Sequence, residues 1–446
     1  MNPSKENSQL LKLLGVGFGI AVTVGGTIGT GILRKPGVIA EFIPNYTMAL
    51  LLWAAIGLYS LLGALCAIEL AISMPQAGAW YVYARKAFGN YFGFVTGITS
   101  WLGTVAAIGF GAYTLSEYLG LLIPACIGYE RYLAIAMLIV ITSFHMIGSK
   151  TGGKSQEILA IIKAVGLLFF VFICFYYGGN LNSEISTTDL VKVNTHIGFL
   201  AIISAMQAIF YTYDGWHTAA YFTEENTDPA KTLPKSMITG VLLVTVIYLL
   251  VNAAIMYVIP PDQLVGSKLA AADAIQMIFG AGVGKVVTIF LLISILGICN
   301  AQVMFAPRVI YSMGRDNLFF KSVLSVNKGG SPVFALAITS AMSSLLIISG
   351  KNTCAILSDI ATFFFVMSYC AGFAALIRLR YSFPEMNRPY KAPFFPYLPL
   401  LLLVVSLIFL VGAVYNDIES SKFALIFLVC SYPLYKMVQK MYSKAS

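Results

Sequence analysis

The sequence predicts an all-α integral membrane protein, and three observations lead to that prediction. The 446 residues are 59% hydrophobic and only 11% charged, whereas about 25% of the residues in soluble domains are charged. Apolar runs long enough to cross a bilayer as helices recur along the whole chain. Two of these runs are interrupted by glycine and polar residues at corresponding places in the chain.

The apolar runs predict about twelve transmembrane helices, because they are too long for the strands of a membrane barrel. The predicted spans are 11–42, 47–72, 91–121, 131–148, 154–178, 197–223, 236–259, 282–312, 332–350, 354–379, 396–415 and 421–440. The first run exceeds the apolar core of a signal peptide and no A-x-A-like site follows it, so we expect no cleaved leader.

The distribution of basic residues predicts the orientation in the membrane. Most of the 28 Lys and Arg residues fall in segments that a cytoplasmic N-terminus would place inside, as the positive-inside rule requires. An even number of spans then places the C-terminus in the cytoplasm too. The net charge of +9 is spread over loops, so it predicts neither nucleic acid nor an acidic partner.

The first interruption is the stretch VGGTIGTGI at residues 24–32. Glycine costs about 1 kcal/mol relative to alanine inside a helix, so a helix that only spans has little use for this cluster. The stretch predicts either a helix broken near mid-membrane, whose exposed backbone binds a ligand, or close helix packing through small residues. Taken alone, it supports both equally.

The second interruption is YTYDGWH at residues 211–217, within the sixth predicted span. Two units of five helices, each led by an interrupted helix, are what an inverted-repeat transporter predicts. A polar kink facing a packed interior is the alternative, and the matching positions favour the transporter. The predicted units are residues 1–178 and 179–394, and residues 395–446 hold the last two helices and a cytoplasmic tail.

The polarity of the two breaks predicts a site for a zwitterion. A break at residues 28–31 leaves free N–H groups at the N-terminus of an outer half-helix, which suits a carboxylate. The outer half of the sixth helix ends near Tyr211 and Tyr213, and its free carbonyls suit an ammonium group. A free α-amino acid is the simplest ligand that fits, with its side chain toward Trp216 and His217.

Ionisable residues within the predicted spans are the other signal, because they are costly in a membrane. Lys163 lies well inside the fifth span, where a buried lysine can lose its proton or stand in for a sodium ion. The alternative is a lysine that snorkels to the interface. We expect Asp214 to cap a half-helix or to bind backbone N–H groups, with direct substrate contact less favoured.

The remaining polar and aromatic residues have plainer interpretations. Glu69 is expected to pair with a basic loop, and His145 and His196 to be ordinary polar residues near span ends. Trp53, Trp80 and Trp101 are expected to pack or to anchor the interface. The three histidines and seven cysteines show no metal or redox spacing, so no metal or cofactor is predicted.

Four stretches resemble the amino acid–polyamine–organocation superfamily, especially its L-type amino acid transporter branch. They are GGTIGTGI with Pro36-Gly37-Val38, ELAISMPQAGAWYVYARKAFG at residues 69–89, YDGWHTAAYFTEENTDPAKTLPKS at 213–236, and RVIYSMGRD at 308–316. They follow the family's order across most of the chain. The motifs are specific for the superfamily and weak for the substrate.

The resemblance implies a LeuT-type fold of ten core helices plus two, with helices one and six interrupted. It implies that the first break binds the substrate carboxylate and that carbonyls of the sixth helix bind the amine. Lys163 matches a fifth-helix lysine that replaces a cation, which implies proton-coupled or sodium-independent transport. The predicted substrate-binding residues are Ile28, Gly29, Thr30, Gly31, Phe210, Tyr211, Tyr213, Asp214, Trp216 and His217.

Two departures from the family pattern concern the substrate. His217 stands where L-type relatives often have asparagine, and Arg34 and Lys35 add charge to the outer half-helix. Both argue against a simple large neutral substrate. Among transport hypotheses, an amino acid/amine exchanger or a polyamine carrier ranks second, because only Asp214 offers a carboxylate near the breaks. An enzyme ranks far lower, since no catalytic cluster is found.

We therefore predict a multi-pass permease of the cell membrane, with the bacterial inner membrane favoured by its compact loops. Its expected partners are an amino acid, protons as a candidate coupling ion, and the lipid bilayer. No GxxxxGK[ST] motif is present, which argues against a primary pump. Cys126 lies near the place where some relatives bind a second subunit, but we treat it as unpaired and predict no partner subunit.

Overall fold

The protein is described here from a computed structural model, which places residues 10, 12, 14–180, 198–267, 269–280, 284–349, 353–416 and 418–443. The α-helices of the first half are α1 (Val16–Thr27), α2 (Thr30–Phe42), α3 (Tyr46–Ser73), α4 (Trp80–Phe88), α5 (Asn90–Leu122), α6 (Glu130–Ile147) and α7 (Ser149–Tyr177). Those that follow are α8 (Phe199–Tyr213), α9 (Pro229–Val258), α10 (Pro261–Leu264), α11 (Ala270–Phe279), α12 (Gly284–Arg315), α13 (Val333–Ser349), α14 (Thr353–Ser382), α15 (Tyr397–Asn416) and α16 (Ile418–Ser443). Short 3-10 turns are η2 (Pro124–Cys126), η3 (Gly178–Asn180), η5 (Thr218–Glu225) and η6 (Lys321–Leu324).

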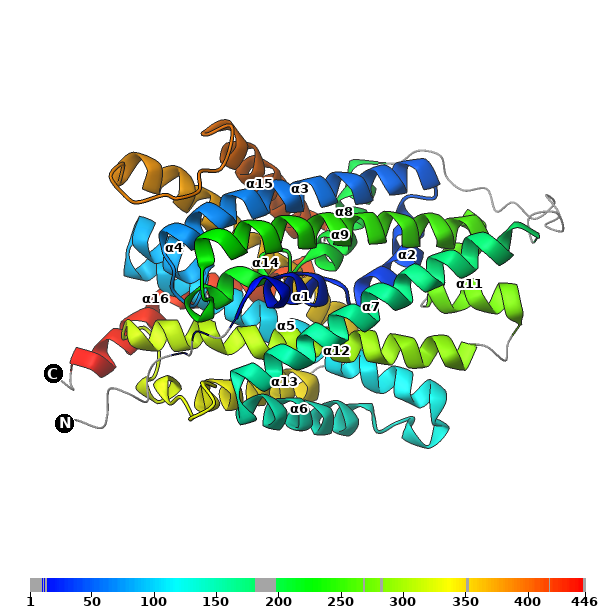
Figure 1. Ribbon diagram of the computed structural model, residues 1–446, viewed down its shortest axis with the longest axis horizontal. Helices are drawn as coiled ribbons and strands as arrows, with labels where there is room; N and C mark the ends of the chain where they lie inside the picture. Colours follow the sequence, from blue (N-terminus) through cyan, green and yellow to red (C-terminus); the bar gives the residue numbers. More distant parts are fainter. Residues whose placement is uncertain are drawn as a thin grey trace.

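The long helices lie along the longest axis of the molecule, and both termini lie at one end of it (Figure 1). Among the described residues, nine helical segments are long and apolar enough to cross a membrane. One of these segments is α1 and α2 taken together. The prediction of an all-α membrane protein is confirmed, whereas the count of twelve spans stays a prediction.

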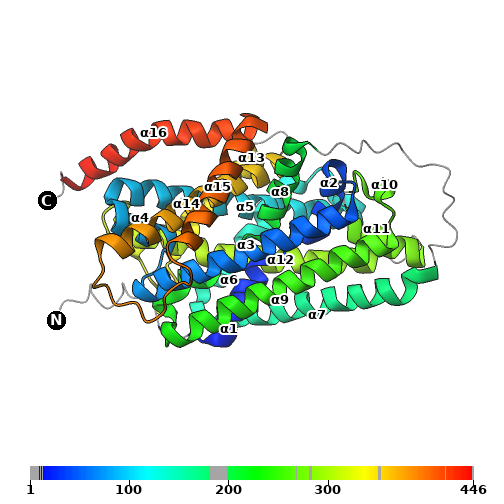
Figure 2. The ribbon, with the colours of Figure 1, turned by 90° about the horizontal axis from the view of Figure 1, so that it is seen from above.

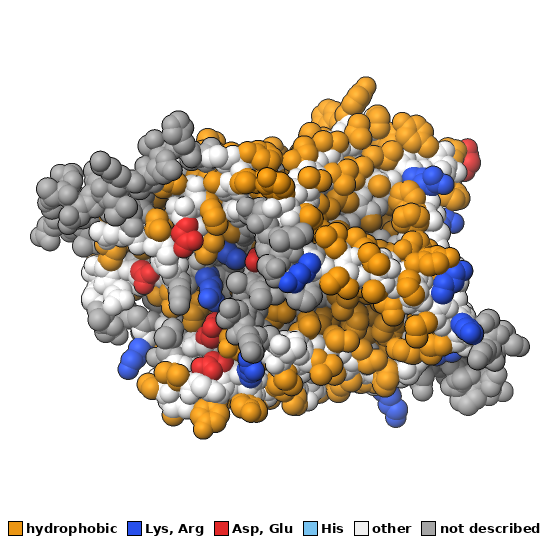
Figure 3. Space-filling view, turned by 180° about the vertical axis from the view of Figure 1, so that it is seen from behind, with side chains coloured by type: hydrophobic (Ala, Val, Ile, Leu, Met, Phe, Trp, Pro, Cys, Tyr) orange, Lys and Arg blue, Asp and Glu red, His pale blue; other side chains and the backbone are white. Residues whose placement is uncertain are grey.

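The surface has the layering that a bilayer requires. On the face seen in Figure 3, hydrophobic side chains form a broad band across the middle. Lys and Arg predominate among the charged side chains at its right-hand end, which is the end that carries the termini. This is the end that the sequence assigns to the cytoplasm, and the clustering is what the positive-inside rule describes.

Helix α1 lies in the middle of the molecule in the view of Figure 1 and reaches its lower edge in that of Figure 2. It packs against α7, α9 and α12, while the most extensive helix contacts are those of α5 with α12 and α14 and of α3 with α9. Every residue of α1 from Ala21 to Thr27 is buried. A helix that is buried on all sides reads as continuously apolar in sequence, which explains why α1 shows no polar face.

The structure shows how the interrupted sixth span is built, and it adds two short helices to the spans expected from sequence. The predicted sixth span, 197–223, divides into α8, a turn at residues 214–217, and η5. Gly215 has a φ of +114°, a left-handed conformation that cannot continue a right-handed helix. Helices α4 and α11 were not expected, because each is too short to be a span and hydrophobic periodicity alone did not separate them from loops.

Candidate functional site

The glycine stretch forms the junction between α1 and α2. Ile28 leaves the helix with an extended ψ of 109°, and Gly29 begins α2 without any side-chain cap. Gly29, the residue that precedes α2, has no side chain with which to cap the first N–H groups of that helix. A Cβ on Gly31 would lie 2.5 Å from the Thr212 hydroxyl of α8, so the glycines also permit close packing. The stretch therefore combines an interruption of the helix with close packing, and ligand binding at the interruption stays a prediction.

The end of α8 meets that junction directly. The Asp214 N–H donates to the carbonyls of Phe210 at 3.0 Å and Tyr211 at 3.3 Å, which closes the last turn. A Cβ on Gly215 would lie 2.5 Å from the Gly26 carbonyl oxygen. Only glycine allows this approach, and the structure thereby brings the two predicted interruptions into backbone contact.

Tyr248 of α9 lies beside both junctions, and sequence reasoning missed it. Its hydroxyl is 2.8 Å from the Thr27 carbonyl oxygen and 3.0 Å from the Thr212 carbonyl oxygen. A phenol has one proton to donate, so the two carbonyls share it. A tyrosine inside an apolar span gives no distinguishing pattern in a single sequence.

Lys163 of α7 points at the C-terminal end of α1. Its Nζ donates to the carbonyl of Gly25 at 2.9 Å and to that of Ile28 at 2.7 Å, and the side chain is fully buried. The hypothesis of a snorkelling lysine is therefore wrong. A cation is favourable here because the carbonyl end of a helix carries partial negative charge.

Asp214 caps the C-terminal end of α8, which is one of its two predicted roles. Among the described residues its carboxylate bonds to side chains, and no bond from a backbone N–H to it is found. The Tyr369 hydroxyl of α14 donates to Oδ1, and His217 Nε2 lies 3.3 Å from the same oxygen. All three side chains are buried. The prediction considered partners near in sequence, whereas Tyr369 is 155 residues away.

Aromatic rings surround this cluster. The Trp216 ring lies 5.1 Å from Tyr369, 5.0 Å from His217 and 5.8 Å from Trp80, measured between centroids. Such edge and tilted contacts stabilise buried rings. Trp53, Trp80 and Trp101 are all buried, so they pack in the interior, and the alternative of an interface anchor is wrong for them.

Tyr211 and the charged pair of the outer half-helix lie on the other side of the junctions. The Tyr211 ring is 5.3 Å from Phe110 of α5, and the Lys35 ammonium lies 5.6 Å from the Tyr211 ring centroid. Arg34 pairs with Glu117 of α5 at 3.4 Å. The ten predicted contact residues are buried, and they cluster around the junctions.

A buried ion pair, also missed by the sequence analysis, ties η5 to α12 toward the end that carries the termini. Arg308 donates to Glu225 from Nε at 2.6 Å and from its terminal nitrogen at 2.9 Å. Both side chains are at most 3% exposed. The same guanidinium reaches Ser149 of α7 at 3.3 Å. The two residues lie in family motifs, but only the fold shows that they meet.

The other ionisable candidates form bonds that stabilise the packing of the helices. Glu69 binds Arg380 and Arg388, as predicted. His145 is buried and bonds to Asn300 at 2.9 Å, so it is more than an ordinary polar residue at a span end. His196 lies outside the described residues. Within the described ranges, no group of three His, Cys, Asp or Glu side chains is arranged to hold a metal ion.

Comparison with known proteins gives a consistent result. The family model described as "Amino acid permease" matches residues 19–432. The serine/threonine exchanger SteT of Bacillus subtilis (strain 168) is 28% identical over 98% of both chains. The b(0,+)-type amino acid transporter 1 of Mus musculus is 28% identical over 92% of this chain and 84% of its own. The large neutral amino acids transporter small subunit 2 of Homo sapiens is 27% identical over 90% of this chain and 76% of its own.

Proposed function

Because the chain belongs to the amino acid permease family, and so to a family of transporters rather than enzymes, we propose that it is a secondary active transporter of amino acids. It works by alternating access. The observation that carries the proposal is the close approach of Gly31, in the first turn of α2, to Thr212, in the last turn of α8, which sets the N-terminus of α2 beside the C-terminus of α8. An α-amino acid carries the two charges that these helix ends attract.

The proposed roles follow from the polarity of the helix ends. Ile28, Gly29, Thr30 and Gly31 bind the carboxylate through backbone N–H groups, since α2 begins at Thr30 without a side-chain cap. The carbonyls at the end of α8, from Phe210, Tyr211 and Tyr213, bind the amine. Asp214, Trp216 and His217 lie beyond that end and face the substrate side chain.

Lys163 is the proposed coupling residue. Its ammonium group already satisfies two carbonyls of the α1 end, which are the kind of oxygens that a sodium ion would otherwise use. Transport is therefore proposed to be independent of sodium, with protons as the coupling ion.

The proposed architecture is a LeuT-type inverted repeat with helices one and six interrupted. Residues 1–178 form its first half, residues 179–394 its second, and residues 395–446 lie outside the repeat. We place both termini in the cytoplasm and the protein in a bacterial inner membrane. It acts without a partner subunit in this proposal, which is compatible with Cys126 being a free cysteine.

Exchange is the second candidate, because the relative SteT is named as an exchanger. An amino acid/amine exchanger would use the same two helix ends in one direction of its cycle. A polyamine carrier is less supported, since it needs free carboxylates and Asp214 is already engaged by Tyr369 and His217.

Uptake by proteoliposomes tests the proposal. Purified protein is reconstituted, and uptake of a panel of labelled amino acids is measured with and without a proton gradient, with and without sodium, and with empty or amino-acid-loaded vesicles. We expect uptake without sodium. Stimulation by an inward proton gradient supports coupling, and stimulation only by internal amino acid supports exchange. No uptake or exchange of any amino acid would refute the proposal.

A further inference from the structure

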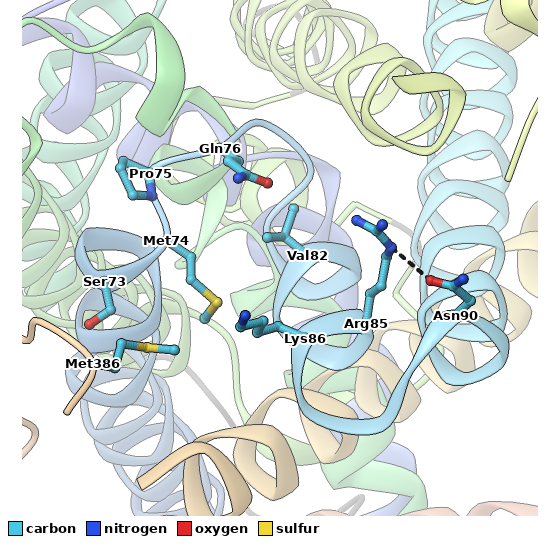
Figure 4. A pocket seen from close by; sticks show the side chains of 9 residues that line it. All are labelled: Ser73, Met74, Pro75, Gln76, Val82, Arg85, Lys86, Asn90 and Met386. Carbon is cyan, nitrogen blue, oxygen red and sulfur yellow. Dashed lines mark hydrogen bonds between the residues drawn. The ribbon is translucent and has the colours of Figure 1, made fainter. Parts of the chain in front are cut away.

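A polar pocket of about 590 Å³ lies at the end of the molecule that carries the termini, away from the helix junctions. It is bounded by the end of α3, by α4, by the start of α5 and by Met386 (Figure 4). Lys86 extends from α4 across the pocket, and Arg85 stands beside it on the same helix. None of the nine lining residues is acidic.

The charge inside this pocket is only partly compensated. Arg85 pairs with Asp316 at 2.6 Å and donates from Nε to Asn90 at 3.0 Å. Lys86 makes no ion pair with any described carboxylate, and its ammonium lies 4.9 Å from the centroid of the Phe383 ring. Two cations thus face a single acidic partner, which leaves a net positive site.

Further hydrogen-bond donors line the same space. The 33-residue helix α5 begins at Asn90 without a side-chain cap, so its positive end opens at the pocket. The Gln76 side chain is exposed at the pocket wall. Cations and helix N–H groups together form a donor set that binds phosphate.

The surroundings indicate where such a phosphate would come from. Phe383, whose ring lies 4.9 Å from the Lys86 ammonium, is 39% exposed, and Phe92, two residues after Asn90 on α5, is 55% exposed. Exposed aromatic rings at the end of a membrane-spanning bundle are typical of the lipid–water interface. A phosphate held in this pocket would have its acyl chains beside those rings. Basic pockets in such places bind anionic lipid headgroups.

We propose that this pocket binds the phosphate of an anionic phospholipid headgroup, with Lys86, Arg85 and the α5 N-terminus as its ligands. Free phosphate would form the same bonds, but it has no acyl chains that could contact the exposed rings. The assignment does not depend on which amino acid is transported.

The test compares Lys86→Gln with Lys436→Gln, since Lys436 is exposed on α16 and does not line the pocket. Detergent-purified full-length protein is titrated with phosphatidylglycerol, phosphatidylcholine or inorganic phosphate, and thermal stability is recorded. Native mass spectrometry counts the bound lipid. We expect phosphatidylglycerol to stabilise the protein, with its affinity about fivefold weaker in Lys86→Gln and unchanged in Lys436→Gln.

Three results would overturn the assignment. Stabilisation by inorganic phosphate equal to that by phosphatidylglycerol would make the source free phosphate. Equal weakening in the two lysine variants would mean general attraction to the surface. Absence of any preference for phosphatidylglycerol over phosphatidylcholine would mean that the pocket does not select an anionic headgroup.

Discussion

The two helix junctions at the centre of the molecule are held in different ways. At the junction of α1 and α2, Lys163 and Tyr248 donate to backbone carbonyls. At the end of α8, the Asp214 carboxylate is bound by the side chains of Tyr369 and His217. A site built from backbone recognises what all amino acids share, whereas one built from side chains can distinguish among them. We therefore expect variants at the first junction to change transport of every substrate, and variants at the second to change preference.

The largest effect is expected where the junctions touch. Gly215→Ala places a Cβ against the Gly26 carbonyl and forces alanine into a left-handed conformation, a combination that costs at least about 1–3 kcal/mol. We expect a loss of uptake of about 100-fold, measured in proteoliposomes at equal amounts of folded protein. The control is Gly280→Ala, because Gly280 also has a positive φ but nothing within 4 Å of its Cβ position. Equal loss in both variants would show that backbone strain alone, and not the contact, is responsible.

The next effect tests the first junction alone. Lys163→Ala leaves the Gly25 and Ile28 carbonyls without their donor, and losing a charged hydrogen bond in a buried site costs about 1–3 kcal/mol. We expect uptake of all substrates to fall by about tenfold, and the remaining uptake to be independent of pH. Lys154→Ala is the control, since Lys154 is exposed on the same helix. If uptake by Lys163→Ala still depends on pH, Lys163 does not couple transport to protons.

A smaller effect is expected from the cluster at the second junction. Tyr369→Phe removes one hydroxyl from the Asp214 carboxylate and keeps the ring, so the apparent affinity should fall by about fivefold. Competition against a labelled substrate measures this change. Tyr91→Phe, which removes a hydroxyl bonded to Ser431 at the periphery, should leave affinity unchanged. Matching losses in the two variants would argue for a general packing effect.

The smallest effect concerns substrate preference. His217 lies 3.3 Å from Asp214, a long contact, so His217→Asn should change total uptake by less than about threefold. Its expected result is a changed order of competing amino acids, measured by inhibition of labelled uptake. Thr142→Ala, far from the junctions and bonded to Ser340, should keep the original order. An unchanged order in His217→Asn would contradict a role for His217 in selecting side chains.

Local signals in the sequence were sufficient to locate the two helix junctions. The glycines at 25, 26, 29 and 31 and the Asp-Gly pair at 214–215 revealed both junctions, because departures from helix are encoded nearby. Lys163 was conspicuous because ionisable residues within membrane helices are rare. These signals needed no knowledge of how helices pack.

Partners distant in sequence could not be predicted in the same way. Tyr248 and Tyr369 lie in apolar helices whose composition suits any buried face, and only the packing of α9 and α14 brings them to the junctions. For that reason the sequence does not predict that the Asp214 carboxylate bonds to Tyr369 and His217. Glu225 and Arg308 are 83 residues apart, and a single sequence carries no information that pairs them.

The Glu225–Arg308 pair has a consequence for leakage. Parting η5 from α12 would separate two charges that are almost completely shielded from water, and breaking a buried pair costs about 3–5 kcal/mol. Thermal fluctuation alone would then populate the parted arrangement in roughly one molecule in 150 to one in 5,000. Without substrate, the fraction of molecules in which η5 and α12 are parted would therefore be small. Such a protein would let little solute leak down a concentration gradient.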